Sequence, residues 1–302
     1  MLQRFAAQYE ELRLGRYEWN VPLSKYTTWK IGGPAELFVE PRGKEALAQT
    51  IKLLYEYRLP WLCMGRGSNI LVMDKGVRGV VIHLAEGLDY ACREGDSLVA
   101  GGAYSFIKLA VLAGKEGLTG LEFAGGIPGT VGGAVYMNAG AHGSDVSRIF
   151  ESADIVLDTG ELVTYRVDDM QYAYRHSVLH GRLGIVAEAR FRLEHGDRKE
   201  IAAVLASYKE RRLRTQPFSS ACAGSVFRNP PGDYSARLIE EAGLKGMRAG
   251  RAEVSTQHAN FIVNTGQATA HDVLTLMKRI QERIKTTYGI ELIPEVMVVG
   301  ER

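Results

Sequence analysis

Several features that would assign a protein to a specialised class are missing from this sequence of 302 residues. Its three cysteines, Cys63, Cys92 and Cys222, are odd in number and widely spaced, which suits neither a disulfide framework nor a CxxC metal pair. No apolar run approaches the roughly 18 residues of a membrane span, and residues 1–18 lack the apolar segment of a signal peptide. We therefore expect a reduced, cytoplasmic protein with no membrane insertion and no metal.

Charge of one sign is not in large excess either. The chain has 37 Lys and Arg residues against 35 Asp and Glu residues, a formal net charge of +2. This balance provides no long-range field to gather a polyanion, so nucleic acid is not an expected partner. The densest basic run, residues 209–214, is either the solvated end of a helix or a local phosphate contact. No obligate protein partner is indicated.

Glycine, by contrast, is abundant, with 34 of 302 residues, or about 11%, against a usual share of roughly 7%. One glycine-rich segment is Gly65-Arg66-Gly67-Ser68-Asn69, and the other, residues 125–133, has five glycines in nine positions. Glycine lets backbone N–H groups approach an anion closely, so together the segments indicate a pyrophosphate site. The first segment alone is also typical of a hairpin turn. Neither matches the GxxxxGK[ST] or GxGxxG fingerprints of common nucleotide sites.

Apolar periodicity predicts an α+β chain of two domains. Residues 47–55, 106–117 and 197–214 are typical of helices, and residues 59–64 and 184–193 are typical of strands. The composition changes near the third of these helices, where we place the domain boundary.

Four further expectations concern single elements. Residues 11–26 read as an amphipathic lead-in, and residues 225–228 as a strand. A long helix follows Thr269, a plausible N-cap with Asp272 in its first turn. The second glycine-rich segment is expected to be a loop.

The glycine-rich segments, together with other motifs in the same order, resemble the UDP-N-acetylenolpyruvoylglucosamine reductases. The other motifs are Thr27-Thr28-Trp29-Lys30-Ile31-Gly32-Gly33, Tyr174-Arg175-His176-Ser177, Gly224-Ser225-Val226-Phe227-Arg228-Asn229-Pro230, Gly243-Leu244-Lys245-Gly246 and Pro294-Glu295-Val296. The resemblance extends from about Tyr26 to Val299. The short stretch between Ser225 and Lys245 is similar to the shorter class of the family, which lacks a tyrosine-bearing loop insertion.

This resemblance implies a two-part FAD-binding region of the vanillyl-alcohol-oxidase-like (PCMH) type, followed by a smaller α+β substrate-binding domain. We assign residues 1–197 to the first, in parts of about 1–84 and 85–197, and residues 198–302 to the second. The FAD is expected to be noncovalent, because Asn69 occupies the place of a tethering histidine and no histidine precedes His83. The implied cofactor contacts are Gly65, Arg66, Gly67, Ser68, Asn69, Gly125, Gly126, Ile127, Pro128, Gly129, Thr130, Gly132, Gly133, Ala134 and Val186.

The reaction that the resemblance implies is the NADPH-dependent reduction of an enolpyruvyl ether of UDP-N-acetylglucosamine, in peptidoglycan synthesis. Ser225 would supply a proton, while Arg175 and Glu295 would stabilise the anionic intermediate. A planar guanidinium suits bidentate recognition of a carboxylate. The implied substrate contacts are Arg214, Asn229, Lys245 and His258.

Two other functions are compatible with the same motifs. One is an FAD-dependent oxidase of the same fold class, which the missing tethering histidine disfavours. The other is a sugar-nucleotide sensor without chemistry, which the presence of Arg175, Ser225 and Glu295 together disfavours.

Overall fold

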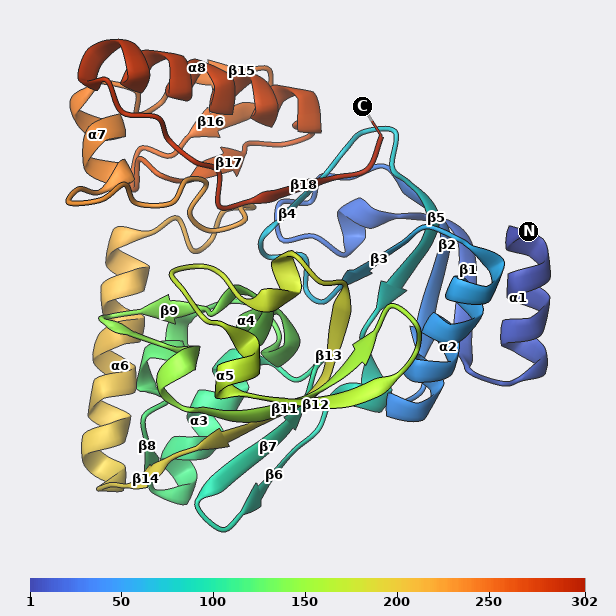
Figure 1. Cartoon of the computed structure of the whole chain (residues 1–302). Coiled ribbons are helices and arrows are strands. Elements are labelled where there is room, and N and C mark those ends of the chain that lie inside the picture. Colours follow the sequence, from blue (N-terminus) through green and yellow to red (C-terminus); the bar gives the residue numbers. More distant parts are fainter. Residues whose placement is uncertain (302) are drawn as a thin grey trace. The chain divides into compact units, whose positions relative to one another are not determined.

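The chain divides into two compact units, each assembled from segments that are separate in the sequence (Figure 1). The structure is a computed structural model and describes residues 1–301. Unit 1 comprises Met1–Trp19, Leu37–Gly65 and Gly79–Arg211, and unit 2 comprises Asn20–Glu36, Arg66–Arg78 and the chain from Arg212 onward. Among the described residues, no helix combines the length and apolar character needed to cross a bilayer.

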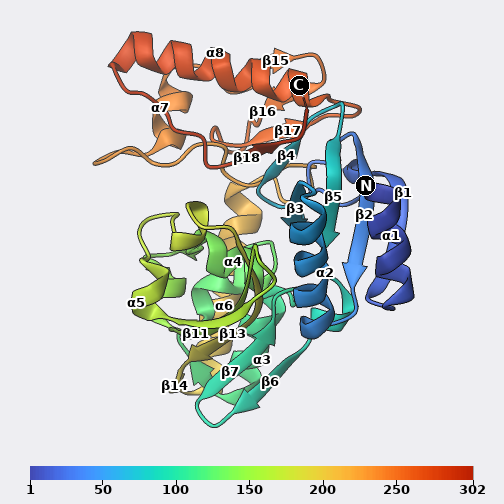
Figure 2. The same ribbon diagram turned by 45° about the vertical axis from the view of Figure 1, so that its right-hand side comes forward.

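The first sheet of the chain has four strands in the order β1-β2-β5-β3. These strands are β1 (Gly15–Pro22), β2 (Pro34–Pro41), β3 (Trp61–Met64) and β5 (Val77–His83). Helices α1 (Leu2–Glu11) and α2 (Lys44–Tyr57) lie side by side in both ribbon views (Figures 1 and 2). Helix α2 buries Leu47, Ile51 and Leu54, as the helical spacing of these residues predicts.

The second sheet lies within unit 1 and is antiparallel, in the order β12-β11-β13-β7-β6. Its strands are β6 (Ala91–Glu94), β7 (Ser97–Gly101), β11 (Phe150–Leu157), β12 (Leu162–Arg166) and β13 (Gly184–Arg192). The other elements around it are α3 (Phe106–Glu116), β8 (Leu118–Thr119), α4 (Val131–Met137), β9 (Gly140–Ala141), β10 (Ser144–Asp145), α5 (Val167–Met170) and β14 (Glu194–His195). Helix α4 packs on β13. The apolar core of this part of unit 1 includes Phe106, Val135 and Phe191. Helix α6 (Arg198–Thr215) carries the chain from unit 1 into unit 2.

Unit 2 is a small α+β assembly built around helix α8 (Ala270–Tyr288). Its other elements are β4 (Ile70–Val72), α7 (Ser235–Glu241), β15 (Arg248–Ala249), β16 (Ala252–Val254), β17 (Ile262–Asn264) and β18 (Met297–Val299). Helix α8 lies along the sheet β15-β16-β17 (Figure 1), and β18 pairs in parallel with β4. The predicted N-cap is confirmed, because Thr269 and Asp272 form a reciprocal capping box.

Trp29 explains why a segment near the N-terminus belongs to unit 2. Its side chain is fully buried in the apolar core of that unit, and its indole N–H donates to the carbonyl of Ile262 at 2.7 Å. Its own carbonyl accepts from the side-chain amide of Asn264 at 3.0 Å. A buried indole N–H needs a partner, and here the partner lies 233 residues away in the sequence.

The α+β class and most predicted elements are confirmed, whereas three local predictions are wrong. Residues 11–26 are not an amphipathic lead-in, because α1 ends at Glu11 and β1 follows. Residues 225–228 are not a strand, since only an isolated bridge joins Phe227 to Pro294. The second glycine-rich segment is not all loop, because its last residues begin helix α4.

Asn260 replaces sheet pairing for the segment that follows Ser225. Its side chain is buried, with Oδ1 accepting from the amide of Phe227 at 3.0 Å and Nδ2 donating to the carbonyl of Phe227 at 2.8 Å. Its own carbonyl accepts from the amide of Val226 at 2.9 Å. One side chain therefore satisfies both backbone groups of Phe227.

We expect Asn260→Ala to lower the free energy of unfolding of unit 2 by about 1–3 kcal/mol, because it leaves a buried N–H and C=O without partners. Asn260→Asp keeps the acceptor but buries a carboxylate 2.8 Å from the Phe227 carbonyl oxygen, so its loss should be at least as large. Urea unfolding, followed by tryptophan fluorescence in a Trp19→Phe, Trp61→Phe background that leaves only Trp29 in the buried core, measures both variants. Equal stability of Asn260→Ala and the parent protein would contradict this role.

Candidate functional site

The two glycine-rich segments meet at Gly65 and Thr130, both in unit 1. A Cβ atom added to Gly65 would lie 2.6 Å from the Thr130 hydroxyl oxygen and 2.8 Å from its methyl carbon. Thr130 is itself buried, so it has little room to move away. A side chain at position 65 would therefore push the two segments apart, and the close approach requires glycine.

Within unit 2, the first segment continues against the Thr27-Thr28 motif. Gly67 has φ of +59°, and a Cβ there would lie 2.4 Å from the carbonyl oxygen of Tyr26. The carbonyl of Gly67 accepts from the amide of Thr28 at 3.2 Å. Two of the motifs that the sequence analysis singled out thus form one packed turn.

The second segment is partly helical rather than an open loop, since helix α4 begins within it at Val131. Thr130 caps helix α4, and its hydroxyl accepts from the amide of Gly133 at 3.2 Å. The amide of Gly132 donates to the carbonyl of Gly102, and that of Ala134 to the carbonyl of Thr130, both at 2.9 Å. Because these amides are already used, direct donation to a phosphate falls to residues ahead of Val131.

Within unit 1, Gly65 and residues 125–130 form a cradle whose close backbone approach suits a flavin diphosphate. Backbone and small side chains line it, so a phosphate can come close to N–H groups. Val186 contributes differently, because its side chain is buried in the unit 1 core at 3% exposure and only its main chain faces Gly132. The individual cofactor contacts stay predictions.

Arg175 lies at the tip of a tight turn in unit 1. Ala173 and His176 exchange two backbone hydrogen bonds of 3.1 Å, which leaves Tyr174 and Arg175 between them. Arg175 adopts a left-handed conformation with φ of +54°, uncommon for a residue with a side chain. Its guanidinium donates to the carbonyl of Gly140 at 2.9 Å and lies over the Tyr174 ring.

Two side chains hold this turn against the end of helix α4. Asn138 donates from Nδ2 to the carbonyl of Ala173 at 3.0 Å, and Ser177 donates its hydroxyl proton to the carbonyl of Tyr136 at 2.6 Å. Asn138 and Ser177 are both buried. The glycine-rich segment that starts α4 and the turn that carries Arg175 are therefore parts of one rigid piece of unit 1.

Ser225 and Glu295 are brought together in unit 2. The amide of Glu295 donates to the carbonyl of Val226 at 2.8 Å, directly beside Ser225. On its other side, the carbonyl of Glu295 accepts from Nδ2 of Asn69 at 3.2 Å, and the carbonyl of Asn69 accepts from Met297 at 3.0 Å. The main chain of Glu295 is thus bonded to the serine segment and to the first glycine-rich segment.

Asn69 has a role here that sequence reasoning missed. It was assigned to the cofactor, and that assignment stays a prediction; its side-chain amide also donates to the backbone carbonyl of Glu295. No local signal could have revealed this, because the two residues are 226 positions apart.

The predicted substrate residues Asn229 and Lys245 both lie near helix α7 in unit 2. Asn229 Oδ1 accepts from the amide of Ser235 at 3.1 Å, in the first turn of the helix. Lys245 donates to the carboxylate of Glu240 at 2.6 Å, so its charge has a counterion. Both contacts fix the side chains, and their assignment to the substrate stays a prediction.

His258 is half-buried and holds a defined tautomer. Its Nδ1 accepts from the amide of Asn260 at 3.3 Å, which leaves the proton on Nε2. Burial lowers the pKa of His258 below its usual value, and Lys245 and Arg212 lower it further by charge repulsion, against a smaller opposing effect of Glu240. At neutral pH it is therefore an uncharged donor. The fourth predicted residue, Arg214, is exposed at the end of α6.

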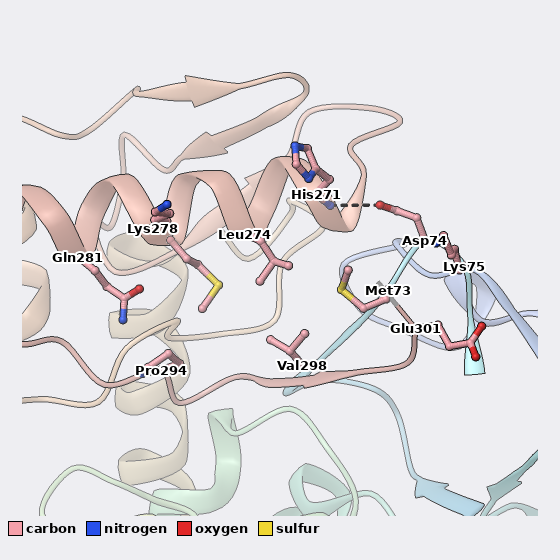
Figure 3. Close-up of a pocket in the computed structure, with 11 residues that line it drawn as sticks. Met73, Asp74, Lys75, His271, Leu274, Lys278, Gln281, Pro294, Val298 and Glu301 are labelled. Carbon is pink, nitrogen blue, oxygen red and sulfur yellow. Dashed lines mark hydrogen bonds between the residues drawn. The ribbon is translucent and has the colours of Figure 1, made fainter. Parts of the chain in front are cut away.

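A separate hollow of about 660 Å³ lies in unit 2 between α8 and β18 (Figure 3). Met73, Leu274 and Val298 form its apolar floor, and Asp74 at its end accepts from the amide of His271 at 3.2 Å. None of the predicted site residues lines it. We therefore assign it no part in the candidate site.

Comparison with known proteins identifies both regions of the chain. Residues 35–166 match an FAD binding domain, and residues 216–299 match the C-terminal domain of UDP-N-acetylenolpyruvoylglucosamine reductase. The chain is 48% identical to the UDP-N-acetylenolpyruvoylglucosamine reductase of Anoxybacillus flavithermus over 302 residues, 100% of both chains. It is 45% identical to that of Bacillus subtilis over 300 residues, 99% of each.

Solved structures agree with this assignment. The crystal structure of the reductase from Thermus caldophilus matches with a TM-score of 0.82 and 38% identity, over 94% of this chain and 99% of the other. A berberine bridge enzyme variant shares the fold alone, with a TM-score of 0.51 and 12% identity over 64% of this chain and 44% of the other. The predicted FAD-binding fold is confirmed, and the chain belongs to the UDP-N-acetylenolpyruvoylglucosamine reductase family.

Proposed function

We propose that this protein reduces the enolpyruvyl ether of UDP-N-acetylglucosamine to UDP-N-acetylmuramate in peptidoglycan synthesis, with FAD as cofactor and NADPH as hydride donor. The observation that carries the proposal is the backbone bonding that brings the segments of Ser225 and Glu295 together in unit 2. The amide of Glu295 donates to the carbonyl of Val226, and the side chain of Asn69 donates to the carbonyl of Glu295. Membership of the family supports the choice of substrate. The proposed location is the cytoplasm.

When bound, FAD supplies the hydride that the substrate accepts. The chain's own task is to bind and orient the enolpyruvyl group and to deliver a proton. Hydride addition next to a carboxylate builds negative charge on that group, so a cation aimed at it stabilises the transition state. We assign this task to Arg175, whose turn is fixed by Asn138 and Ser177.

Ser225 is the proposed proton donor to the carbon beside the new C–H bond. An aliphatic hydroxyl is a weak acid, so efficient proton transfer requires that it be held precisely in place. The bonds of Asn260 to Phe227 and of Glu295 to Val226 fix the segment that carries Ser225. Glu295, in its protonated form or through a water, stabilises the anionic intermediate. A bare carboxylate in that place would repel the intermediate.

We expect the FAD to be released by acid precipitation, with the yellow chromophore in the supernatant. The reason is the side chain at position 69, which is an amide bonded to the Glu295 carbonyl and cannot form a link to flavin. Absorbance spectra of pellet and supernatant measure this. Flavin retained in the pellet would show a covalent link, and a protein that cannot be reconstituted with FAD would overturn the proposed function.

We expect Ser225→Ala to leave flavin reduction by NADPH unchanged and to slow its reoxidation by the sugar nucleotide about 10²–10⁴-fold, because only the second step needs a proton donor. Anaerobic stopped-flow absorbance follows the two steps separately. Ser219→Ala, at an exposed serine of the same unit, is the matched control. Equal slowing of both steps in Ser225→Ala would assign the serine a structural role instead.

Substitutions of Arg175 and Lys245 should change different kinetic constants, although both side chains are cations. Arg175→Ala should lower the saturated reoxidation rate, since it removes charge aimed at the transition state. Lys245→Ala should mainly raise KM, since the charge of a remote diphosphate is constant through the reaction. Rates across a range of substrate concentrations separate the two effects. The reverse pattern would show that the roles of the two cations are exchanged.

A further inference from the structure

Asn138 is a buried amide at the end of helix α4, and it connects two separate segments of unit 1. Its side chain is only 3% exposed, and its backbone is left-handed, with φ of +44°. Burying an amide is unfavourable unless its donor and its acceptor both find partners. Here Nδ2 donates to the carbonyl of Ala173 at 3.0 Å, and Oδ1 accepts from the amide of Ser147 at 2.9 Å.

The first of these segments is the tight turn that carries Arg175. The carbonyl of Ala173 also accepts from the amide of His176 at 3.1 Å, so the backbone closes the turn without help from Asn138. The Asn138 side chain therefore adds something other than the shape of the turn. Its bond fixes where the turn lies relative to the end of α4.

The second segment follows the hairpin of β9 and β10, which contacts the Arg175 side chain. In this hairpin Gly140 pairs with Asp145, and a Cβ atom at Gly140 would lie 2.6 Å from that of Asp145, so the two strands are tightly closed. The carbonyl of Gly140 accepts from the Arg175 guanidinium at 2.9 Å. The amide of Ser147, just after β10, is shared between Asn138 and the Asp145 carboxylate. One side chain thus bonds to the ends of both elements that hold Arg175.

We propose that Asn138 is a positioning residue for substrate reduction, which sets the direction of the Arg175 guanidinium by bonding to both the turn and the hairpin. Helix α4 is capped by Thr130 in the glycine-rich cradle and ends at Asn138, so one short helix joins the cradle to the guanidinium. A cation stabilises a transition state only where it is aimed at the developing charge. A misplacement of about 1 Å can cost about 10²-fold in rate. The inference rests on the proposed function and on the role of Arg175 in it.

The test compares Asn138→Gly with the parent protein in the FAD-loaded enzyme. Glycine removes the amide and keeps the left-handed backbone, which it adopts without strain. Arg58→Gly is the matched control, because Arg58 is an exposed residue with a left-handed backbone at the end of α2 in the same unit. Anaerobic stopped-flow absorbance follows flavin reduction by NADPH and reoxidation by the enolpyruvyl substrate. Both steps are also measured after the two glycine substitutions are introduced separately into Arg175→Ala.

We expect Asn138→Gly to lower the saturated reoxidation rate about 10–100-fold and to leave flavin reduction within about twofold of the parent. Arg58→Gly should leave both steps within about twofold. In the Arg175→Ala background, Asn138→Gly should slow reoxidation by no more than about twofold, because a residue that acts through another has no effect once the other is gone. A merely structural role would slow reoxidation by the same factor in both backgrounds.

An unchanged reoxidation rate in Asn138→Gly, or the same loss with and without Arg175, would overturn the inference. If Asn138→Gly does not fold, Asn138→Asp decides the question by the same pair of backgrounds, since it keeps the acceptor for Ser147 and removes the donor to Ala173. Failure of the proposed function is a different result. It would appear in the parent enzyme as absence of NADPH-dependent reduction of the enolpyruvyl substrate, or in Arg175→Ala alone as a reoxidation rate equal to that of the parent.

Discussion

The burial of Trp29 in the core of unit 2 is the interaction on which the rest of the arrangement depends. The indole fills that core completely and bonds to the carbonyl of Ile262, so the chain between Asn20 and Glu36 has to belong to the C-terminal unit. The turn at Gly67 is packed on the neighbouring residues Tyr26 to Thr28. As a result, Asn69 and strand β4 lie in the same unit as Glu295 and strand β18.

This arrangement gives the two ends of the first glycine-rich segment different contacts. Its start at Gly65 approaches the second segment at Thr130, where the fold suits a flavin diphosphate. Its end at Asn69 bonds to the backbone of Glu295, the proposed assistant in proton transfer.

The sequence by itself determined the class of fold, the family and the candidate catalytic residues. Glycine spacing, the helical periodicity of α2 and α8 and the capping pair Thr269 and Asp272 depend on local geometry, which a sequence encodes directly. Ser225, Glu295 and Arg175 could be named because their motifs are contiguous. The sequence could not show that residues 131–134 begin a helix, because five glycines in nine positions weaken any helical signal.

Only the tertiary structure decided which side chains meet. Asn69 and Glu295 are 226 residues apart, Trp29 and Ile262 are 233 apart, and Asn260 bonds to a residue 33 positions earlier. Each of these is a hydrogen bond between a side chain and the main chain of a distant segment, and such bonds follow no sequence pattern.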